Sequence, residues 1–448
     1  MEKRDLIAAI DIGTTKVVAI AGELIGEGVI RIIGVINKDS YGVNKGVVTN
    51  VNDVSEIVKA AIQELNALIK IQITDVFVGI AGQHISSLPV RGNTKITGVD
   101  DIITQQDVTK LVGGLYNATF SDGDKIVHVI PQTFSVDNET DVVNPIGMSG
   151  KTLGVNCHVV FGKNASVNNI YSCIKNAGLH VRELILEPLA SSTAVLTKSE
   201  KEVGVALVDI GGGTTDIAIY YDGIIRHTAV IPFGGDVITK DIKDAFKIMY
   251  DQARDLKHQF GIALPQKKYS DRVVVVDGVE GRRSKEINQF MLSRVIEARL
   301  KEILGSIYSE IKSVRCENKL GAGIVLTGGG ALLADIDKMI ETETGLEVRI
   351  GFPDRYIDNS SIESVIMPIY STSVGLVLRG YHIILKGDST FNKVVSQSAE
   401  KPADSSIKEE KVKVKEESKI GRGFVSTIKS GFKKFTDMAF ESEDAKLD

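Results

Sequence analysis

The chain has 448 residues, 43% of them hydrophobic, and a net charge of −5 at pH 7. Its length favours about two to four domains, and its slightly acidic charge gives no reason to expect a nucleic-acid partner. The three cysteines, Cys157, Cys173 and Cys316, show no CxxC or Cys/His spacing, so we expect free thiols rather than disulfides or a metal site. We expect no secretory leader, and no apolar run reaches the roughly 18 residues of a membrane-spanning helix.

The first motif is an apolar run that leads into a polar turn, made of Asp11, Gly13, Thr14, Thr15 and Lys16. Apolar segments resume after this turn and again at Ile30, so residues 5–36 are expected to form three strands. Glycine lets backbone N–H groups approach a ligand, the threonine hydroxyls add donors, and the lysine adds a positive charge. We interpret the turn as part of a phosphate-binding site. A purely structural glycine hairpin is the alternative.

A helix is expected from Asn52, with apolar residues at helical spacing as far as Leu68, followed by a buried strand over 75–81. Residues 83–160 are richer in turns and short strands, with a helix near Gln105–Leu115, and we interpret them as an inserted α+β subdomain. A helix over 165–177 and a short strand over 184–186 follow.

A second turn of the same kind lies in the middle of the chain, and its candidate phosphate-binding residues are Asp209, Gly211, Gly212, Gly213, Thr214 and Thr215. Because an Asp-x-Gly hairpin followed by a third strand occurs twice, the sequence indicates an internal duplication. Two such hairpins facing each other would hold a triphosphate. Asp11 and Asp209 would hold a hydrated Mg²⁺, which prefers carboxylate, water and phosphate oxygens. No helix is expected directly after the glycines, so the turn is not a P-loop.

The second half continues with Gly234 and Gly235 and a long helix over 239–259. A short strand pair within 271–279 and a helix over 283–312 are expected next. A strand over 324–327 then leads into Gly328, Gly329 and Gly330 and a helix from Leu332, an arrangement that suits the adenosine and α-phosphate. A last helix is expected over 371–381.

The C-terminal part is different in composition. Residues 388–418 are mostly charged or polar, which predicts a disordered tether. Residues 419–440 form a basic amphipathic pattern, and the residues expected to contact a membrane are Phe424, Val425, Ile428, Lys429, Phe432, Lys433, Lys434 and Phe435. A basic face opposite phenylalanine and isoleucine is typical of a helix that lies on an anionic membrane. Docking of this helix on the protein itself or on a partner is the alternative.

These motifs resemble the superfamily of actin, heat-shock chaperones and sugar kinases, with DIGTTK (11–16), VDIGGGTTD (208–216) and IVLTGGGALL (324–333) in its order. Further segments, VHVIPQTFSVD (127–137), NPIGMSGKTL (144–153), LEPLASS (186–192) and VRIGFP (348–353), are similar to the FtsA family of bacterial cell-division proteins. The resemblance covers about residues 5–385.

The resemblance implies an actin-like α/β fold. Two duplicated ribonuclease-H-like domains would surround a nucleotide cleft, each with a small subdomain, followed by the tail. The expected parts are a first core (1–82 and 161–200), the FtsA-type insertion (83–160), a second core (201–236 and 319–386), an adenosine-side subdomain (237–318), the linker (387–418) and the membrane helix (419–440).

The resemblance also implies site residues and partners. Glu187 matches the carboxylate that orients the attacking water in chaperone relatives, although a glutamate at a helix start also has a simple electrostatic use. Lys285, at the expected start of the helix over 283–312, would meet the ribose or base. Arg299 matches a basic position that contacts the tail of the tubulin-like protein FtsZ, although a solvated helix face is as good an explanation.

The function implied is that of an ATP- and Mg²⁺-binding protein. It would assemble into filaments on the cytoplasmic face of the membrane at the division site, anchor FtsZ and recruit later division proteins. A slow ATPase activity is left open. The alternatives are an actin-like pilus-assembly ATPase or a soluble kinase or ATPase of the same superfamily. A chaperone would need a peptide-binding domain after residue 385, for which too few residues follow.

Overall fold

The computed structural model describes residues 6–26, 28–116, 123–278, 280 and 282–385. The tether predicted over 387–418 and the amphipathic helix predicted over 419–440, with all eight of its membrane-contact residues, lie outside the described residues.

The first sheet has five strands in the order β11-β6-β1-β2-β3. The strands are β1 (Leu6–Ile12), β2 (Lys16–Gly26), β3 (Val29–Asp39), β6 (Asp75–Ile80) and β11 (His180–Leu186). β1, β2 and β3 are antiparallel neighbours, whereas β6 runs parallel to both β1 and β11. Helices α1 (Val51–Ile69) and α3 (Asn164–Asn176) pack against this sheet and against each other. The side chain of Asn50 caps α1 by accepting from two backbone N–H groups.

The second sheet repeats this topology in the order β14-β13-β12-β17-β18. Its strands are β12 (Val205–Ile210), β13 (Thr215–Tyr221), β14 (Ile224–Ile231), β17 (Ile324–Thr327) and β18 (Val348–Ile350). Three antiparallel strands again precede two parallel ones. The duplication read from the two hairpins is therefore confirmed by the pairing of whole sheets.

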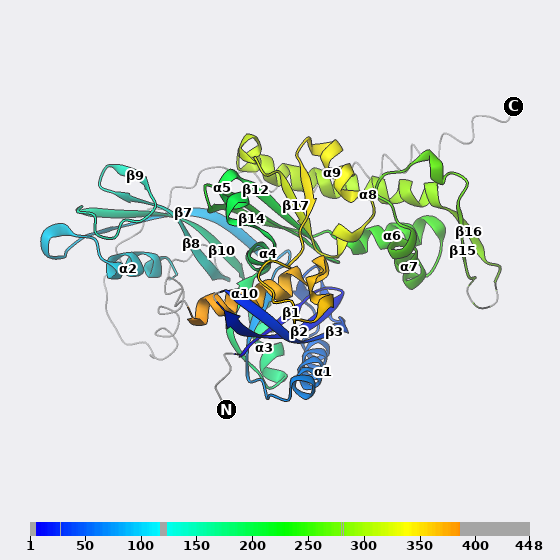
Figure 1. Cartoon of the computed structure of the whole chain (residues 1–448), viewed down its shortest axis with the longest axis horizontal. Coiled ribbons are helices and arrows are strands. Elements are labelled where there is room, and N and C mark those ends of the chain that lie inside the picture. Colours follow the sequence, from blue (N-terminus) through cyan, green and yellow to red (C-terminus); the bar gives the residue numbers. More distant parts are fainter. Residues whose placement is uncertain (1–5, 27, 117–122, 279, 281, 386–448) are drawn as a thin grey trace. The chain divides into compact units, whose positions relative to one another are not determined.

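Two helices lie between the sheets, α4 (Glu187–Val195) and α10 (Ser371–Leu385), as Figure 1 shows. α10 packs on β1, β2 and β6, and α4 packs on β12 and β13. The helices approach each other closely, because a Cβ built on Gly375 would lie 2.0 Å from the carbonyl oxygen of Ala190. A short helix, α5 (Lys198–Val203), connects α4 to β12.

The insertion has its own sheet, in the order β7-β10-β8-β9, and its own apolar core. Its elements are β7 (Ile85–Lys95), α2 (Gln105–Leu115), β8 (Asp124–Val136), β9 (Glu139–Val142) and β10 (Thr152–Lys163). Polar contacts join it to β14: Ser87 Oγ donates to the Thr228 carbonyl oxygen at 2.9 Å, and His158 Nε2 lies 2.7 Å from Thr228 Oγ1.

The remaining elements are two short strands, β4 (Val43–Asn44) and β5 (Val47–Val48), and the group α6 (Gly235–Phe246), α7 (Tyr250–Phe260), β15 (Val273–Val276), β16 (Lys285–Asn288), α8 (Gln289–Ser313) and α9 (Ile336–Thr344). None of the helices in the part of the chain that the structure describes is long and apolar enough to cross a bilayer.

Four helix boundaries differ from the prediction by several residues. The last helix, α10, was expected to end at residue 381 and continues to Leu385. The helix expected over 239–259 is interrupted at Lys247, which has a left-handed φ of 52° and ends α6. The helix expected from residue 283 begins at Gln289, because residues 285–288 pair with the valines of β15. The glycine turn at 328–330 leads first into a 3₁₀ turn (Gly329–Leu332), and α9 begins only at Ile336.

Candidate functional site

The two predicted phosphate turns face each other and touch. Each is closed by the same hydrogen bond: Gly13 N donates to the Lys16 carbonyl at 2.9 Å, and Gly211 N donates to the Thr214 carbonyl at 2.9 Å. A Cβ built on Gly213 would lie 2.3 Å from Thr14 Oγ1, so any side chain there would push the turns apart. A triphosphate lying directly between the two tips would have to separate them.

Several backbone donors in these turns are available to an anion. Among the described residues, no acceptor is hydrogen-bonded to the N–H groups of Thr14, Thr15, Gly212 or Gly213. Successive free N–H groups in a turn form a concave anion-binding surface. Both turns therefore carry the donors that phosphate oxygens need.

The other predicted glycines gather around the end of β12. Gly235 N donates to the Gly211 carbonyl at 2.9 Å, and a Cβ on Gly234 would lie 2.5 Å from that same oxygen. Gly328 has a left-handed φ of 82°, and a Cβ there would lie 2.2 Å from Asp209 Oδ1. Likewise, a Cβ built on Gly330 would lie 2.3 Å from the Ile210 side chain. These positions require glycine because β12 passes so close.

Hydroxyl groups of the two central helices orient the predicted metal-binding carboxylates. Ser373 Oγ donates to Asp11 Oδ2 at 2.8 Å. Ser191 Oγ and Thr372 Oγ1 donate to Asp209 Oδ2 at 2.6 and 3.1 Å. Both aspartates are buried, and burial raises the pKa of each carboxyl above its ordinary value. Helices α4 and α10 thus fix the position of one aspartate from each sheet.

Lys16 is the one predicted cation of the site. It is half-buried, donates to the carbonyl oxygen of Ile369 and lies 4.8 Å from the ring centroid of Tyr370. Burial lowers the pKa of Lys16, while the charges of Asp11, Asp209 and Glu187 act in the opposite direction. The lysine therefore lies within electrostatic range of both aspartates and of the candidate water-orienting glutamate.

Glu187 begins α4 and is packed against Gly79, where a Cβ would lie 3.2 Å from Glu187 Oε1. Burial, and then the charges of Asp11, Asp216 and Asp209, raise the pKa of Glu187 well above its ordinary value. A partly buried glutamate whose pKa is shifted by specific neighbouring carboxyls is a candidate functional group.

Asp216 belongs to this cluster although the sequence analysis did not select it. It pairs across the sheet with Asp209, and Thr214 Oγ1 donates to its Oδ2 at 3.2 Å. Its Oδ1 is buried without a hydrogen-bond partner. Burial, and then Asp209, raise the pKa of Asp216 well above its ordinary value. The available signal was a second aspartate directly after the turn threonines.

Several carboxyls gather near Lys16: Asp11, Asp209 and Glu187 lie within electrostatic range of the lysine, and Asp216 is paired across the sheet with Asp209. Among the described residues, no group of three or more His, Cys, Asp or Glu residues is arranged to hold a metal ion directly. Mg²⁺ usually takes only one or two carboxylates and completes its shell with water and phosphate oxygens. The donor set at Asp11 and Asp209 therefore fits a hydrated Mg²⁺.

Two further lysines near the turns were missed. Lys257 Nζ donates to the Gly235 carbonyl at 2.8 Å, and burial lowers the pKa of this lysine to about 8. Lys45 Nζ lies 4.9 Å from the ring centroid of Phe233, and the next residue's N–H, on Gly46, donates to Thr14 Oγ1 at 3.1 Å. Neither lysine lies in a motif, so only the tertiary structure reveals them.

The structure does not bring Lys285 or Arg299 to the glycine cluster. Lys285 Nζ donates to the carbonyl oxygens of Phe246 and Lys247, at the C-terminal end of α6. The glycines lie at the other end of this 12-residue helix, roughly 18 Å away at 1.5 Å per residue. Arg299 Nη2 donates to Asp241 Oδ1 at 2.9 Å, and the arginine side chain is only 17% exposed. It is therefore not a freely solvated helix residue.

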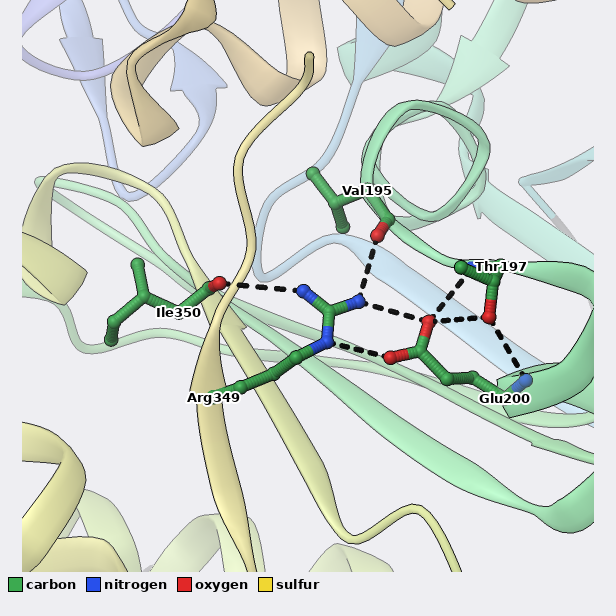
Figure 2. Close-up of polar contacts among 5 residues, drawn as sticks. All are labelled: Val195, Thr197, Glu200, Arg349 and Ile350. Carbon is green, nitrogen blue, oxygen red and sulfur yellow. Dashed lines mark hydrogen bonds and ion pairs between the residues drawn. The ribbon is translucent and has the colours of Figure 1, made fainter. Parts of the chain in front are cut away.

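A partly buried ion pair connects the end of α4 to the second sheet (Figure 2). Arg349 Nε and Nη2 donate to the two carboxylate oxygens of Glu200 at 2.6 and 2.9 Å, and Nη2 also donates to the Val195 carbonyl at 2.9 Å. Thr197 adds its N–H and hydroxyl to the same carboxylate, at 2.7 and 2.9 Å. This network connects the helix that carries Glu187 to β18.

Comparisons with known proteins agree with the fold. A family model described as "Cell division protein FtsA" matches residues 206–375, and one described as "SHS2 domain inserted in FTSA" matches residues 82–161, which contain the β7-β10-β8-β9 sheet. The chain is 37% identical to the cell division protein FtsA of Neisseria meningitidis, covering 84% of this chain and 90% of the relative. It is 36% identical to FtsA of Escherichia coli, covering 88% and 95%.

Solved structures with little sequence similarity share the architecture. The PilM–PilN type IV pilus biogenesis complex matches with a TM-score of 0.62 at 14% identity, covering 84% of this chain and 98% of that one. MreB5 of Spiroplasma citri bound to ADP matches with a TM-score of 0.52 at 14% identity, covering 90% and 100%. At this level of identity, the likeness supports the actin-like fold alone.

Proposed function

Because the chain belongs to the FtsA family of cell division proteins, we propose that it is an ATP-binding, actin-like protein that polymerises at the inner face of the cytoplasmic membrane. In this role it anchors FtsZ filaments to the membrane and recruits later septum-assembly proteins. We base the assignment of the site residues, the tail and the specific partners on the residue chemistry described above and on the family resemblance.

Nucleotide binding is supported most strongly by the charge and donor pattern of the two turns. Lys16 lies within electrostatic range of three carboxyls, those of Asp11, Asp209 and Glu187, while the adjoining glycine turns present free N–H groups. Mg²⁺ would place positive charge beside the carboxylates, and the triphosphate oxygens would accept from these N–H groups. Lys16 would contact the phosphates as a point charge.

ATP acts in this proposal mainly as a conformational ligand. A ligand shifts a conformational equilibrium when it binds one of the two conformations more tightly. Because ATP would contact both turns, its affinity would depend on the distance between them. A slow hydrolysis would use Mg²⁺ to neutralise the developing phosphate charge. Glu187 would orient the attacking water, as the family resemblance implies, and the raised pKa of this carboxyl would help it to accept a proton.

The remaining assignments concern partners. Arg299 would contact the C-terminal tail of FtsZ after exchanging its pairing with Asp241 for a partner carboxylate. The insertion would contribute to self-association. The segment 419–440 would hold the protein on the anionic cytoplasmic leaflet, where many tails on one filament bind far more tightly than one. A soluble kinase would not need this segment, and the sequence relatives are division proteins rather than pilus-assembly proteins.

The test is vesicle co-sedimentation combined with electron microscopy, using the full chain and a version ending at Gly387, each with and without Mg-ATP. We expect nucleotide-dependent filaments on vesicles that contain anionic lipid, and loss of lipid association in the shortened protein. Lipid binding retained by the shortened protein would remove the role of the tail. Absence of filaments from the full chain under all conditions would contradict the cytoskeletal proposal.

A further inference from the structure

The short hairpin formed by β4 and β5 (residues 43–48) ends in a tight turn made by Lys45 and Gly46. Both residues have left-handed φ values, 50° and 72°. Positive φ at both central residues is the geometry that suits two-residue hairpin turns, where asparagine, aspartate or glycine is preferred and a lysine at the first position is uncommon. The turn therefore fixes where the backbone of this hairpin tip lies.

The hairpin tip contacts both nucleotide turns. Gly46 N donates to Thr14 Oγ1 of the first turn at 3.1 Å. Lys45 Nζ lies 4.9 Å from the ring centroid of Phe233, which follows β14 of the second sheet. The carbonyl oxygen of Phe233 accepts from Thr215 Oγ1 of the second turn at 2.8 Å. The cation–π contact of Lys45 thus crosses from the first half of the chain to the second beside the two turns.

The hairpin tip also lies against residues 82–85, the connection that leads into the insertion. A Cβ built on Gly46 would lie 2.6 Å from Gly82 Cα, and one built on Gly82 would lie 2.7 Å from the Gly46 carbonyl oxygen. Gln83 N donates to the Lys45 carbonyl oxygen at 3.3 Å. A shift of the hairpin tip is therefore passed directly to the backbone of this connection.

The insertion is held by both halves of the chain. It is joined to the first half through residues 82–85 and 162–164. It is also hydrogen-bonded to β14 of the second sheet, where Ser87 Oγ donates to the Thr228 carbonyl oxygen at 2.9 Å and Gln132 Nε2 donates to another carbonyl of this strand at 2.6 Å. A change in the separation of the two halves must be taken up at these contacts.

A nucleotide between the turns would change this separation. A Cβ built on Gly213 would lie 2.3 Å from Thr14 Oγ1, so a triphosphate between the two tips must part them. Gly46 is hydrogen-bonded to the first turn, whereas Phe233 is hydrogen-bonded to the second. Parting the turns therefore lengthens the contact between Lys45 and Phe233, and a cation–π attraction is effective only within about 6 Å.

We propose that the 43–48 hairpin is a latch between the two halves, and that nucleotide binding opens it and loosens the connection to the insertion. The latch depends on the proposed nucleotide binding, because ATP is its trigger. Without nucleotide, Lys45 holds Phe233, and the hairpin tip stays packed on Gly82 and Gln83. Because the insertion is proposed to contribute to self-association, the latch connects nucleotide occupancy to assembly.

A latch that holds the unliganded conformation opposes nucleotide binding, because a contact made in only one of two conformations favours that conformation. Phe233→Leu removes the ring and keeps every charge. In equilibrium dialysis, this variant should bind Mg-ATP about two- to five-fold more tightly, the range that an exposed cation–π contact corresponds to. A ring with a merely structural role would weaken binding when removed. Unchanged or weaker binding by Phe233→Leu would overturn the latch.

Hydrogen–deuterium exchange of the full chain measures local opening of the connection itself. Mg-ATP should speed the exchange of the amides of residues 82–85 several-fold. In Phe233→Leu these amides should exchange at the fast rate without nucleotide, and Lys45→Met, which removes the cation, should behave in the same way. The matched control is Tyr308→Leu, which removes a half-buried ring whose centroid lies 4.2 Å from Lys312 Nζ on α8. An effect of the same size in this control would overturn the latch.

The latch and the nucleotide proposal fail separately. If the unaltered chain binds no ATP, the nucleotide proposal is rejected together with the trigger, whereas faster exchange of residues 82–85 in Phe233→Leu without nucleotide would still establish the latch contact. If ATP binds and the exchange of residues 82–85 is the same with and without it, the latch is overturned and nucleotide binding stands.

Discussion

Glu200→Gln should destabilise the protein because it leaves the partly buried Arg349 guanidinium without its counter-charge. In the structure, Arg349 makes two hydrogen bonds to this carboxylate, and Thr197 makes two more. Burial alone would raise the pKa of Glu200, but the hydrogen bonds from Arg349 and Thr197 outweigh it and lower that pKa to about 2, against a reference of 4.5.

The magnitude follows from this shift. A difference of about 2.5 pKa units corresponds to roughly 3.4 kcal/mol at about 1.36 kcal/mol per unit. Because Arg349 is 36% exposed, water screens the pair, and about 1–2 kcal/mol is the expected loss in the free energy of unfolding at pH 7. The folded-state pKa is depressed, so this contribution is present above pH 4.5 and is lost as the pH falls toward about 2.

The assay is urea unfolding of the full chain, followed by circular dichroism at pH 7 and at steps below pH 5. Urea is preferred to guanidinium because it leaves the ionic strength unchanged. Glu202→Gln is the matched control, since it changes an exposed glutamate on the same helix and should have little effect. A Glu200→Gln protein as stable as the unaltered chain at pH 7, or a difference that grows at acidic pH, would refute the reasoning.

Three further outcomes are expected. Mg²⁺-dependent ATP binding should weaken as the pH is lowered, because burial raises the pKa of Asp209. Asp209→Asn should remove most of the Mg²⁺ dependence, measured by titration with a fluorescent ATP analogue. An unchanged Mg²⁺ dependence in this variant would contradict the assignment of Asp209. Arg299→Ala should weaken binding of an FtsZ tail peptide in fluorescence anisotropy, whereas Arg294→Ala, on the exposed side of α8, should not; equal effects would reject the specific contact. Gly375→Ala should cost about 1–3 kcal/mol in urea unfolding, because its Cβ would lie 2.0 Å from a carbonyl oxygen of α4. Gly305→Ala, in the open on α8, should instead gain up to about 1 kcal/mol, and the reverse order would be inconsistent with the packing described.

The sequence predicted the parts of the fold that depend on local patterns. An aspartate at the end of an apolar run, followed by glycines and a second apolar run, identified both hairpins, and each hairpin occurs where expected. A helix start at Glu187 and a helix over 371–381 were also predicted, and the structure has helices at Glu187–Val195 and Ser371–Leu385. These features can be predicted from short stretches of consecutive residues.

The predictions from the sequence were wrong or incomplete where tertiary contacts determine the local structure or the charge environment of a residue. Residues 285–288 look like a helix start, yet they pair with a run of valines and form β16. Lys247 adopts a left-handed conformation that nothing local requires, and it divides a helix that hydrophobic periodicity would continue. Lys257 acquires its charge environment from other elements of the fold and lies in no motif, so it could not be selected in advance, whereas Asp216 could have been selected from its place directly after the turn threonines.

The central claim is that the two turns bind one Mg-ATP, and equilibrium dialysis of labelled ATP against the full chain tests it most directly. We expect saturable, Mg²⁺-dependent binding of one ATP per chain. Gly328→Ala should weaken it at least ten-fold, because the added Cβ would lie 2.2 Å from Asp209 Oδ1. Gly345→Ala, which has a similar φ of 72° but open surroundings, should bind normally. No saturable binding by the full chain, or equal binding by Gly328→Ala, would contradict the account.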